Sequence, residues 1–360
     1  MRDNLPAATK RLVGYYEAGD IGPKQYLVSD IPGGLLSHVI YAFATVTAAG
    51  DCVSVNAKDD GINFPQLANL KAKYVQLRVL ISIGGASHST NFAAVAGDPL
   101  LLTQFVQSSV RFMTQNGFDG IDIDWEFPGS NDSSNFTRLL QELRNQLDSQ
   151  GASDGRNYQL TIAAPAGAKN IANLQLSQIH PLLDWINLET YDFTTARSAV
   201  TNFNAPLFTH KGNNNVDAAV KSYLGGGVPA DKIALGVRFV GTGWQGVGST
   251  NNGLYQPDTG PAPGTWDAAG SAPSGSFGYQ DIEDNYLPTY TRTWDEEAQV
   301  PWLYDADAGI MISYEDLESL TSKVNYAVSN GLSGIMIWEL GSDDSAGTLV
   351  NTVVSALGTS

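Results

Sequence analysis

Four carboxylates fall within eight positions of one apolar stretch, GFDGIDIDWEFPG at residues 117–129. Side chains alternate between the faces of a strand, so Asp122, Asp124 and Glu126 point one way and the intervening apolar residues the other. If the apolar face packs under helices, the acids face an enclosed space. Adjacent carboxylates there repel each other and lose hydration unless they share protons or bind a ligand. Such coupled acids suit general acid–base chemistry.

A purely structural role for these acids is the alternative, in which buried carboxylates cap backbone amides. A single acid would be explained equally well by this structural role and by a functional site. Three acids at i, i+2 and i+4 on one face favour a site. Glu126 is the last of the three, so we expect it to reach a ligand above the strand end, with Asp124 close enough to share a proton and raise its pKa.

Aromatic residues are expected to surround these acids. They fall at the ends of other predicted strands: Tyr15, Phe43, Tyr191 (followed by Asp192) and Trp338. Aromatic ring faces stack on sugar rings, and a glycosidic oxygen needs a proton to leave. Acids among aromatics therefore predict a carbohydrate ligand.

Strand-like and helix-like segments alternate along the chain, and this order predicts a parallel (β/α)₈ TIM barrel rather than an open sheet. In a barrel, residues at the strand C-terminal ends face the active site. The strands are expected at 12–16, 38–46, 78–85, 120–126, 158–165, 185–192, 232–239 and 334–340.

One connection, from Phe239 to Tyr314, is far longer than usual. Its tryptophans and tyrosines favour a small folded α+β insertion beside a cleft over a disordered linker. The expected organisation is a barrel over 1–239, an insertion over 240–313 and the rest of the barrel over 314–360.

Helix-like periodicity covers 99–117 and two further segments with candidate caps. Ser133 is the predicted N-cap of one helix. Ser313 is the predicted N-cap of another, which should stop at Gly331.

The composition excludes several classes of partner. A net charge of −17 and 20 Lys and Arg against 37 Asp and Glu provide no basic patch for nucleic acid or an anionic membrane. The one cysteine, Cys52, excludes an intrachain disulfide and a cysteine-rich zinc site. No His or other ligand clearly accompanies the strand acids, so we expect no metal and no cofactor. No apolar run reaches membrane-spanning length.

The stretch DGIDIDWE resembles the DxxDxDxE signature of family 18 glycoside hydrolases, the chitinase family. The resemblance extends over nearly the whole chain, through GYY, YAF, SIGG, TYD and MIWEL at the ends of other strands. The long connection lies where many bacterial chitinases carry an α+β insertion. The resemblance implies endo-acting, retaining hydrolysis of β-1,4-linked N-acetylglucosamine in chitin or its oligosaccharides.

By this resemblance Glu126 is the general acid and then the base, and Asp124 tunes it, turning between Asp122 and Glu126. Tyr191 and Asp192 would hold the substrate's N-acetyl group, whose own oxygen attacks the anomeric carbon. Trp338 would be the floor under the sugar. The remaining expected substrate contacts are Tyr15, Phe43, Trp244, Glu189 and Arg238.

The chain departs from the family's pattern at strand ends around one barrel mouth. Glu189 replaces a methionine, and Arg238, Val240 and Thr242 stand where proline, tyrosine and arginine are common. Further departures are Ile40, Glu17–Gly19 and Ala86–His88. Inward parity on neighbouring strands predicts an ion pair between Glu189 and Arg238.

The altered mouth leaves alternatives open. They are a barrel rebuilt, naturally or by engineering, for another ligand with Glu189 or His88 as a new base; an endo-β-N-acetylglucosaminidase, disfavoured by the insertion; and a non-hydrolytic lectin, disfavoured by the retained Glu126. We expect weakened hydrolysis by a secreted monomer.

Overall fold

The computed structural model describes residues 10–209, 212 and 214–358. Within them, eight parallel strands form a closed barrel, because β1 pairs with both the second strand and the last strand of the barrel. The barrel strands are β1 (Arg11–Glu17), β2 (His38–Val46), β4 (Arg78–Gly84), β5 (Gly120–Asp124), β6 (Gln159–Pro165), β7 (Trp185–Glu189), β8 (Ile233–Arg238) and β15 (Gly334–Trp338). The predicted TIM barrel is confirmed.

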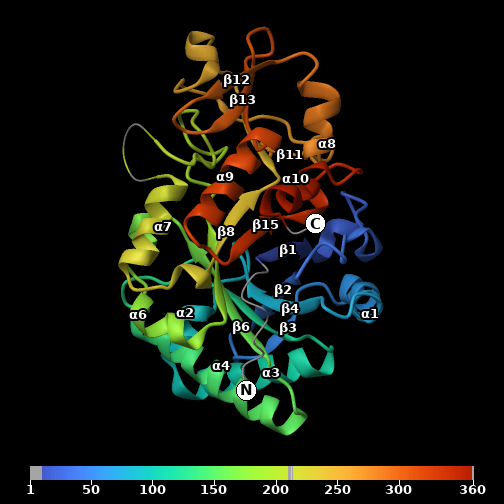
Figure 1. Cartoon of the computed structure of the whole chain (residues 1–360), viewed down its shortest axis with the longest axis vertical. Helices are drawn as coiled ribbons and strands as arrows, with labels where there is room; N and C mark the ends of the chain where they lie inside the picture. Colours follow the sequence, from blue (N-terminus) through green and yellow to red (C-terminus); the bar gives the residue numbers. More distant parts are fainter. Residues whose placement is uncertain (1–9, 210–211, 213, 359–360) are drawn as a thin grey trace.

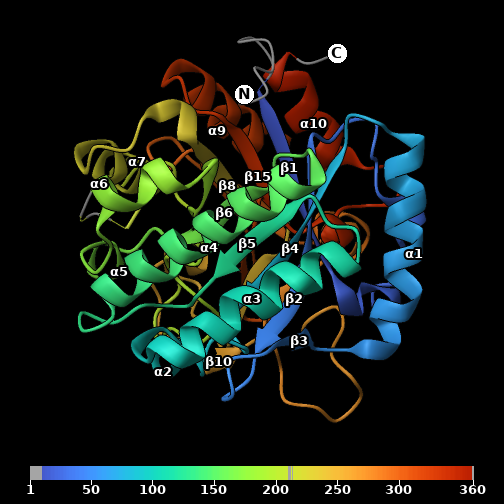
Figure 2. The ribbon, with the colours of Figure 1, turned by 90° about the horizontal axis from the view of Figure 1, so that it is seen from below.

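Helices cover the outside of the barrel, as Figure 2 shows from below. The strands are buried on both faces, which explains their nearly continuous apolar sequences. Outward residues of the strands join the helices in one large apolar cluster, while inward residues such as Val13, Leu80 and Met336 form a smaller one. The helices are α1 (Ala57–Lys73), α2 (Phe92–Gly97), α3 (Pro99–Gln115), α4 (Ser133–Asp154), α5 (Ala168–Ile171), α6 (Leu176–Ile179), α7 (Val216–Gly225), α9 (Leu317–Ser329) and α10 (Thr348–Leu357).

The long connection between β8 and α9 folds into a second sheet, drawn at the top of Figure 1. Its core contains Trp244, Trp302 and Met311, to which Phe203 is added from the connection between β7 and α7, so the aromatic residues of this segment build a small core separate from the barrel. The elements are β9 (Gly241–Gln245), β10 (Gly260–Pro261), β11 (Ser276–Phe277), α8 (Tyr279–Asp281), β12 (Thr291–Asp295), β13 (Val300–Asp305) and β14 (Ile310–Ser313). A short β3 (Cys52–Ser54) pairs antiparallel with β2.

Two predicted helix caps are wrong. Helix α4 includes Ser133 as its first residue, and Asp132 is the N-cap. Ser313 ends β14, and α9 is capped by Asp316, whose side chain accepts hydrogen bonds from two amides of the first turn. An aspartate with two free acceptor oxygens is as good a cap as serine, and the chain reaches α9 only after leaving the second sheet.

No helix among the described residues combines the length and apolar character needed to cross a membrane.

Candidate active site

Asp122 lies inside the barrel on β5 and is held by four donors. Its Oδ2 accepts hydrogen bonds from Tyr15 Oη (2.9 Å) and Ser82 Oγ (2.8 Å), and its Oδ1 from Thr161 Oγ1 (2.6 Å) and Asn187 Nδ2 (3.2 Å). Burial raises the pKa of Asp122, and these donors oppose the rise. Asp122, the acid deepest in the barrel, is thus held by side chains from four strands.

Asp124 lies two positions above Asp122 and lacks such partners. Its side chain is buried, with 3% of the residue exposed, and Oδ1 has no hydrogen-bond partner among the described residues. Burial, followed by the charges of Glu126 and Asp122, raises the pKa of Asp124 well above its usual range. Asp124 therefore holds a proton readily and can share it with a neighbouring acid.

Glu126 follows β5 and is partly accessible. Burial and the charge of Asp192 raise its pKa to about 7, while a hydrogen bond from the Ala86 amide lowers it. The Glu126 amide donates to Ser89 Oγ at 2.9 Å, which fixes the backbone where the strand ends. A carboxylic acid with a pKa near 7 is suited to donate a proton and later accept one.

Asp119, the first acid of the motif, has a structural role. It pairs with Lys71 (2.7 Å) and Arg156 (2.5 Å), and its Oδ2 accepts a hydrogen bond from the Val79 amide (2.9 Å). It precedes β5 and so lies at the opposite end of that strand from Glu126. It bridges two cations there and lies away from the site.

The predicted ion pair between Glu189 and Arg238 is wrong. Arg238 Nη1 instead contacts Asp192 Oδ1 at 3.2 Å and donates to Thr242 Oγ1 at 2.7 Å. Both side chains point into the barrel, as predicted. The register pairs Leu188 with Leu235 and therefore aligns Glu189 with Gly236, which lies two residues before Arg238 on β8. The guanidinium thus extends toward Thr242.

Glu189 lies instead against the strand acids. One carboxylate oxygen from each of Asp124, Glu126 and Glu189 lies within 4.8 Å of the others. Burial, followed by the charges of Asp124 and Glu126, raises the pKa of Glu189 well above its usual range. Glu189 is therefore a third member of the carboxylate group at the top of the column.

Asp192 follows β7 in a left-handed conformation, with a φ of 55°. Its Oδ1 accepts a hydrogen bond from Asn204 Nδ2 at 2.7 Å in addition to the contact with Arg238. Tyr191 beside it is buried in the inner cluster of the barrel. Asp192 is thus held from two sides while 43% of its side chain stays exposed toward a ligand.

An aromatic group adjoins the acids. The rings of Phe43 and Trp338 are stacked with centroids 5.9 Å apart, and Tyr15 lies 5.5 Å from Trp338 in a tilted arrangement. Phe43 and Trp338 are half-buried, so each retains an accessible surface. The structure thus brings these three predicted residues together.

Two other predicted residues lie elsewhere. Trp244 is fully buried in the core of the second sheet, and its Nε1 donates to the Thr195 carbonyl at 3.2 Å. The expectation that Trp244 contacts substrate is wrong, because an aromatic residue in an insertion can build its core as well as line a cleft. His88, considered as a new base, does not join the carboxylate group of Asp124.

A second group of three carboxylates surrounds Lys24. Its Nζ lies 3.2 Å from Glu17, 2.8 Å from Asp20 and 2.5 Å from Glu339. The same ammonium lies 5.1 Å from the ring centre of Trp266 in the second sheet's loops. The barrel's first and last strands are thus tied together by one cation.

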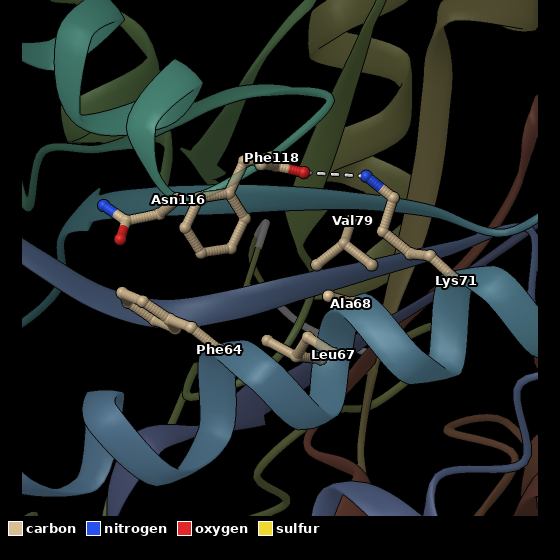
Figure 3. A pocket seen from close by; sticks show the side chains of 8 residues that line it. Phe64, Leu67, Ala68, Lys71, Val79, Asn116 and Phe118 are labelled. Carbon is tan, nitrogen blue, oxygen red and sulfur yellow. Dashed lines mark hydrogen bonds between the residues drawn. The ribbon is translucent and has the colours of Figure 1, made fainter.

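A cavity of about 240 Å³ lies near the opposite end of the barrel, between α1 and the starts of β4 and β5 (Figure 3). Phe64, Leu67 and Phe118 make it mostly apolar. Its one cation, Lys71, donates to the Gly117 carbonyl at 2.8 Å and is already paired with Asp119. Nothing in its lining calls for a charged ligand.

Adjacent acids and aromatic rings at the strand ends of a closed (β/α)₈ barrel are typical of glycoside hydrolases. The chain matches the family described as Glycosyl hydrolases family 18 over residues 11–343. It belongs to this family.

Named relatives agree with this assignment. The chain is 35% identical to Chitinase A1 of Niallia circulans over 404 residues, covering 94% of this chain but only 57% of that protein. It is 34% identical to Endochitinase 1 of Metarhizium robertsii, covering 96% and 84% respectively. The solved structure of Chitinase ChiA74 from Bacillus thuringiensis superposes with a TM-score of 0.92 at 33% identity, covering 98% of this chain and 70% of that one.

Sequence reasoning missed four residues of the site, one of which is Ser89, the acceptor for the Glu126 amide. Thr161 and Asn187 bind Asp122, and Asn204 holds Asp192. Thr161 and Asn187 are polar residues at inward positions of otherwise apolar strands, and that pattern could have identified them. Asn204 lies outside the barrel strands, so no periodicity points to it.

Proposed function

We propose that this chain hydrolyses β-1,4-linked N-acetylglucosamine within chitin or its oligosaccharides, with retention of anomeric configuration. The observation that carries the proposal is Glu126, which is partly accessible and has a pKa of about 7 directly above the buried acids Asp124 and Asp122. Family membership makes chitin the favoured polymer.

The reaction needs one acid and the substrate's own acetamide. Protonated Glu126 donates its proton to the glycosidic oxygen as the bond from that oxygen to the anomeric carbon breaks. The acetamide carbonyl oxygen attacks the same carbon and forms an oxazolinium ion. Glu126, now ionised, removes a proton from water, which attacks the anomeric carbon from the face that the leaving group occupied and breaks its bond to the oxazolinium oxygen, with retention. Asp124 balances the charge that develops on the acetamide nitrogen.

The groups around the acids would position the sugar. Trp338 and Phe43 offer stacked aromatic surface, and Tyr191 and Asp192 lie where they could hold the N-acetyl group. Glu189 adds a carboxylate where the family commonly has methionine. We expect this charge to weaken turnover, because it competes for the proton that Glu126 must donate.

Product analysis with chitooligosaccharides tests the proposal. Glu126→Gln keeps the shape of the side chain but removes the acid, and we expect it to lower the hydrolysis rate by about 10²–10⁴-fold. Glu142→Gln, an exposed residue on α4, is the matched control. Proton NMR of the first product should show the β-anomer. Equal rates in the wild type and Glu126→Gln would reject Glu126 as the acid, and an α-anomer would reject retention.

We further propose that the protein acts outside the cell, because chitin is an extracellular polymer. We also propose that it is a monomer. Size-exclusion chromatography with light scattering would test the monomer.

A further inference from the structure

The acid column carries more negative charge than the reaction requires. Asp124 and Glu126 come from the end of β5, and Glu189 reaches them from β7, across β6. On β6 the residue in register with Glu189 is Pro165, and Ala163 lies one inward layer below it beside Asn187. Substrate-assisted hydrolysis gives Glu189 no role.

No protein cation compensates this group. Among the described residues, none of the three acids forms an ion pair with Lys, Arg or His, and Arg238 is committed to Asp192 and Thr242. Asp124 Oδ1 is buried without a hydrogen-bond partner. An acid left in this state costs free energy unless it is protonated or binds an ion.

The chain contains an internal comparison. The other group of three carboxylates, Glu17, Asp20 and Glu339, encloses the ammonium of Lys24 at 2.5–3.2 Å from each acid. Two groups of the same size thus differ in one respect. The group around Lys24 has its cation built into the chain, and the group at Asp124 does not.

The accessibility of the group at Asp124 limits which cation fits. Glu126 and Glu189 are partly accessible, whereas Asp124 beneath them is 3% exposed. A small ion can therefore approach the group from the accessible side of Glu126 and Glu189. The ligands are oxygen atoms only, which suits a hard cation and not zinc or copper.

We propose that Asp124, Glu126 and Glu189 form a site for a hard divalent cation such as calcium, which enters on the accessible side of Glu126 and Glu189. One carboxylate oxygen of each acid lies within 4.8 Å of the others, and calcium–oxygen distances of about 2.3–2.6 Å let one ion bridge oxygens up to about 5 Å apart. Magnesium demands a near-ideal octahedral geometry, whereas calcium accepts irregular sets of oxygen ligands. Water would complete the shell.

Occupation of this site would inhibit hydrolysis, a consequence that rests on the function proposed above. A cation bound to Glu126 occupies the carboxylate oxygen that must carry the proton. Binding itself does not depend on that function, so the two ideas can fail separately.

Isothermal titration of the whole chain with Ca²⁺ at pH 8 tests the site. We expect one ion per chain with a Kd of about 1 mM or tighter, and an affinity about tenfold or more lower in Glu189→Met and Glu189→Gln. Glu17→Gln removes an acid from the group around Lys24 and is the matched control, with unchanged binding. Thermal unfolding confirms that each variant is folded.

Hydrolysis provides the second readout. Ca²⁺ should slow the wild type and have little effect on Glu189→Met. The proposal is overturned if no binding is detected, if wild type and both Glu189 variants bind equally, or if inhibition by Ca²⁺ is independent of Glu189. If no hydrolysis is seen but Ca²⁺ binds through Glu189, the site stands and the proposed function falls.

Discussion

Removal of Arg238 should loosen Asp192, and a double-mutant cycle can measure the contact. A hydrogen bond to a charged group contributes about 1.5–3 kcal/mol when well shielded. Here the Asp192 side chain is 43% exposed and Arg238 15%, so screening reduces the contact toward the value of about 0.2–1 kcal/mol found for exposed pairs. We therefore expect a coupling free energy of about 1 kcal/mol between Arg238→Met and Asp192→Asn in urea unfolding.

The same measurement with Glu189 is the control. Arg238 forms no ion pair with Glu189, so the cycle of Arg238→Met with Glu189→Gln should return less than about 0.5 kcal/mol. Raising the salt concentration should shrink the coupling with Asp192, because the pair is partly exposed. A coupling with Glu189 larger than that with Asp192 would contradict the observed register and restore the ion pair predicted from the sequence.

Three further predictions concern the acid, the core and the aromatic surface. With a chelator present, hydrolysis should fall about tenfold from pH 6 to pH 8, since the pKa of Glu126 is about 7 and its acid form is required; a flat profile would contradict this. Lys323→Met leaves Glu315 buried without its ion-pair partner and should lower the free energy of unfolding by about 3–5 kcal/mol in urea, with most of the loss recovered by adding Glu315→Leu. Trp338→Ala should weaken chitooligosaccharide binding about tenfold in titration calorimetry, about 1.4 kcal/mol, whereas the buried Trp244→Phe should change stability and leave binding intact.

The barrel could be predicted from sequence because each of its strands is a short apolar run between helix-like segments. Alternation on β5 also gave the common direction of Asp122, Asp124 and Glu126. These features are local, because they depend only on residues adjacent in the chain.

Contacts between strands could not be predicted in the same way. The alternation of side chains along each strand predicts that Glu189 and Arg238 point into the barrel. Whether they lie side by side depends on the register of β7 against β8, which the sequence of neither strand alone determines. The prediction for Trp244 was wrong for a related reason. Its burial depends on the pairing of β9 with β14, and these strands are far apart in the chain. Asn204, which holds Asp192, comes from a segment without periodicity.

The closure of the barrel has a consequence for how the protein is made. Arg11 pairs with Gly334, so β1 lacks one neighbour until almost the whole chain has been synthesised. At about 5–20 residues per second, that wait lasts roughly 15–65 s. During this time β1 keeps one unpaired edge, and β8 adds a second once it has been synthesised; such edges favour association with other chains. Yield from cells should therefore depend on how well nascent chains are protected from aggregation, more than on the stability of the finished barrel.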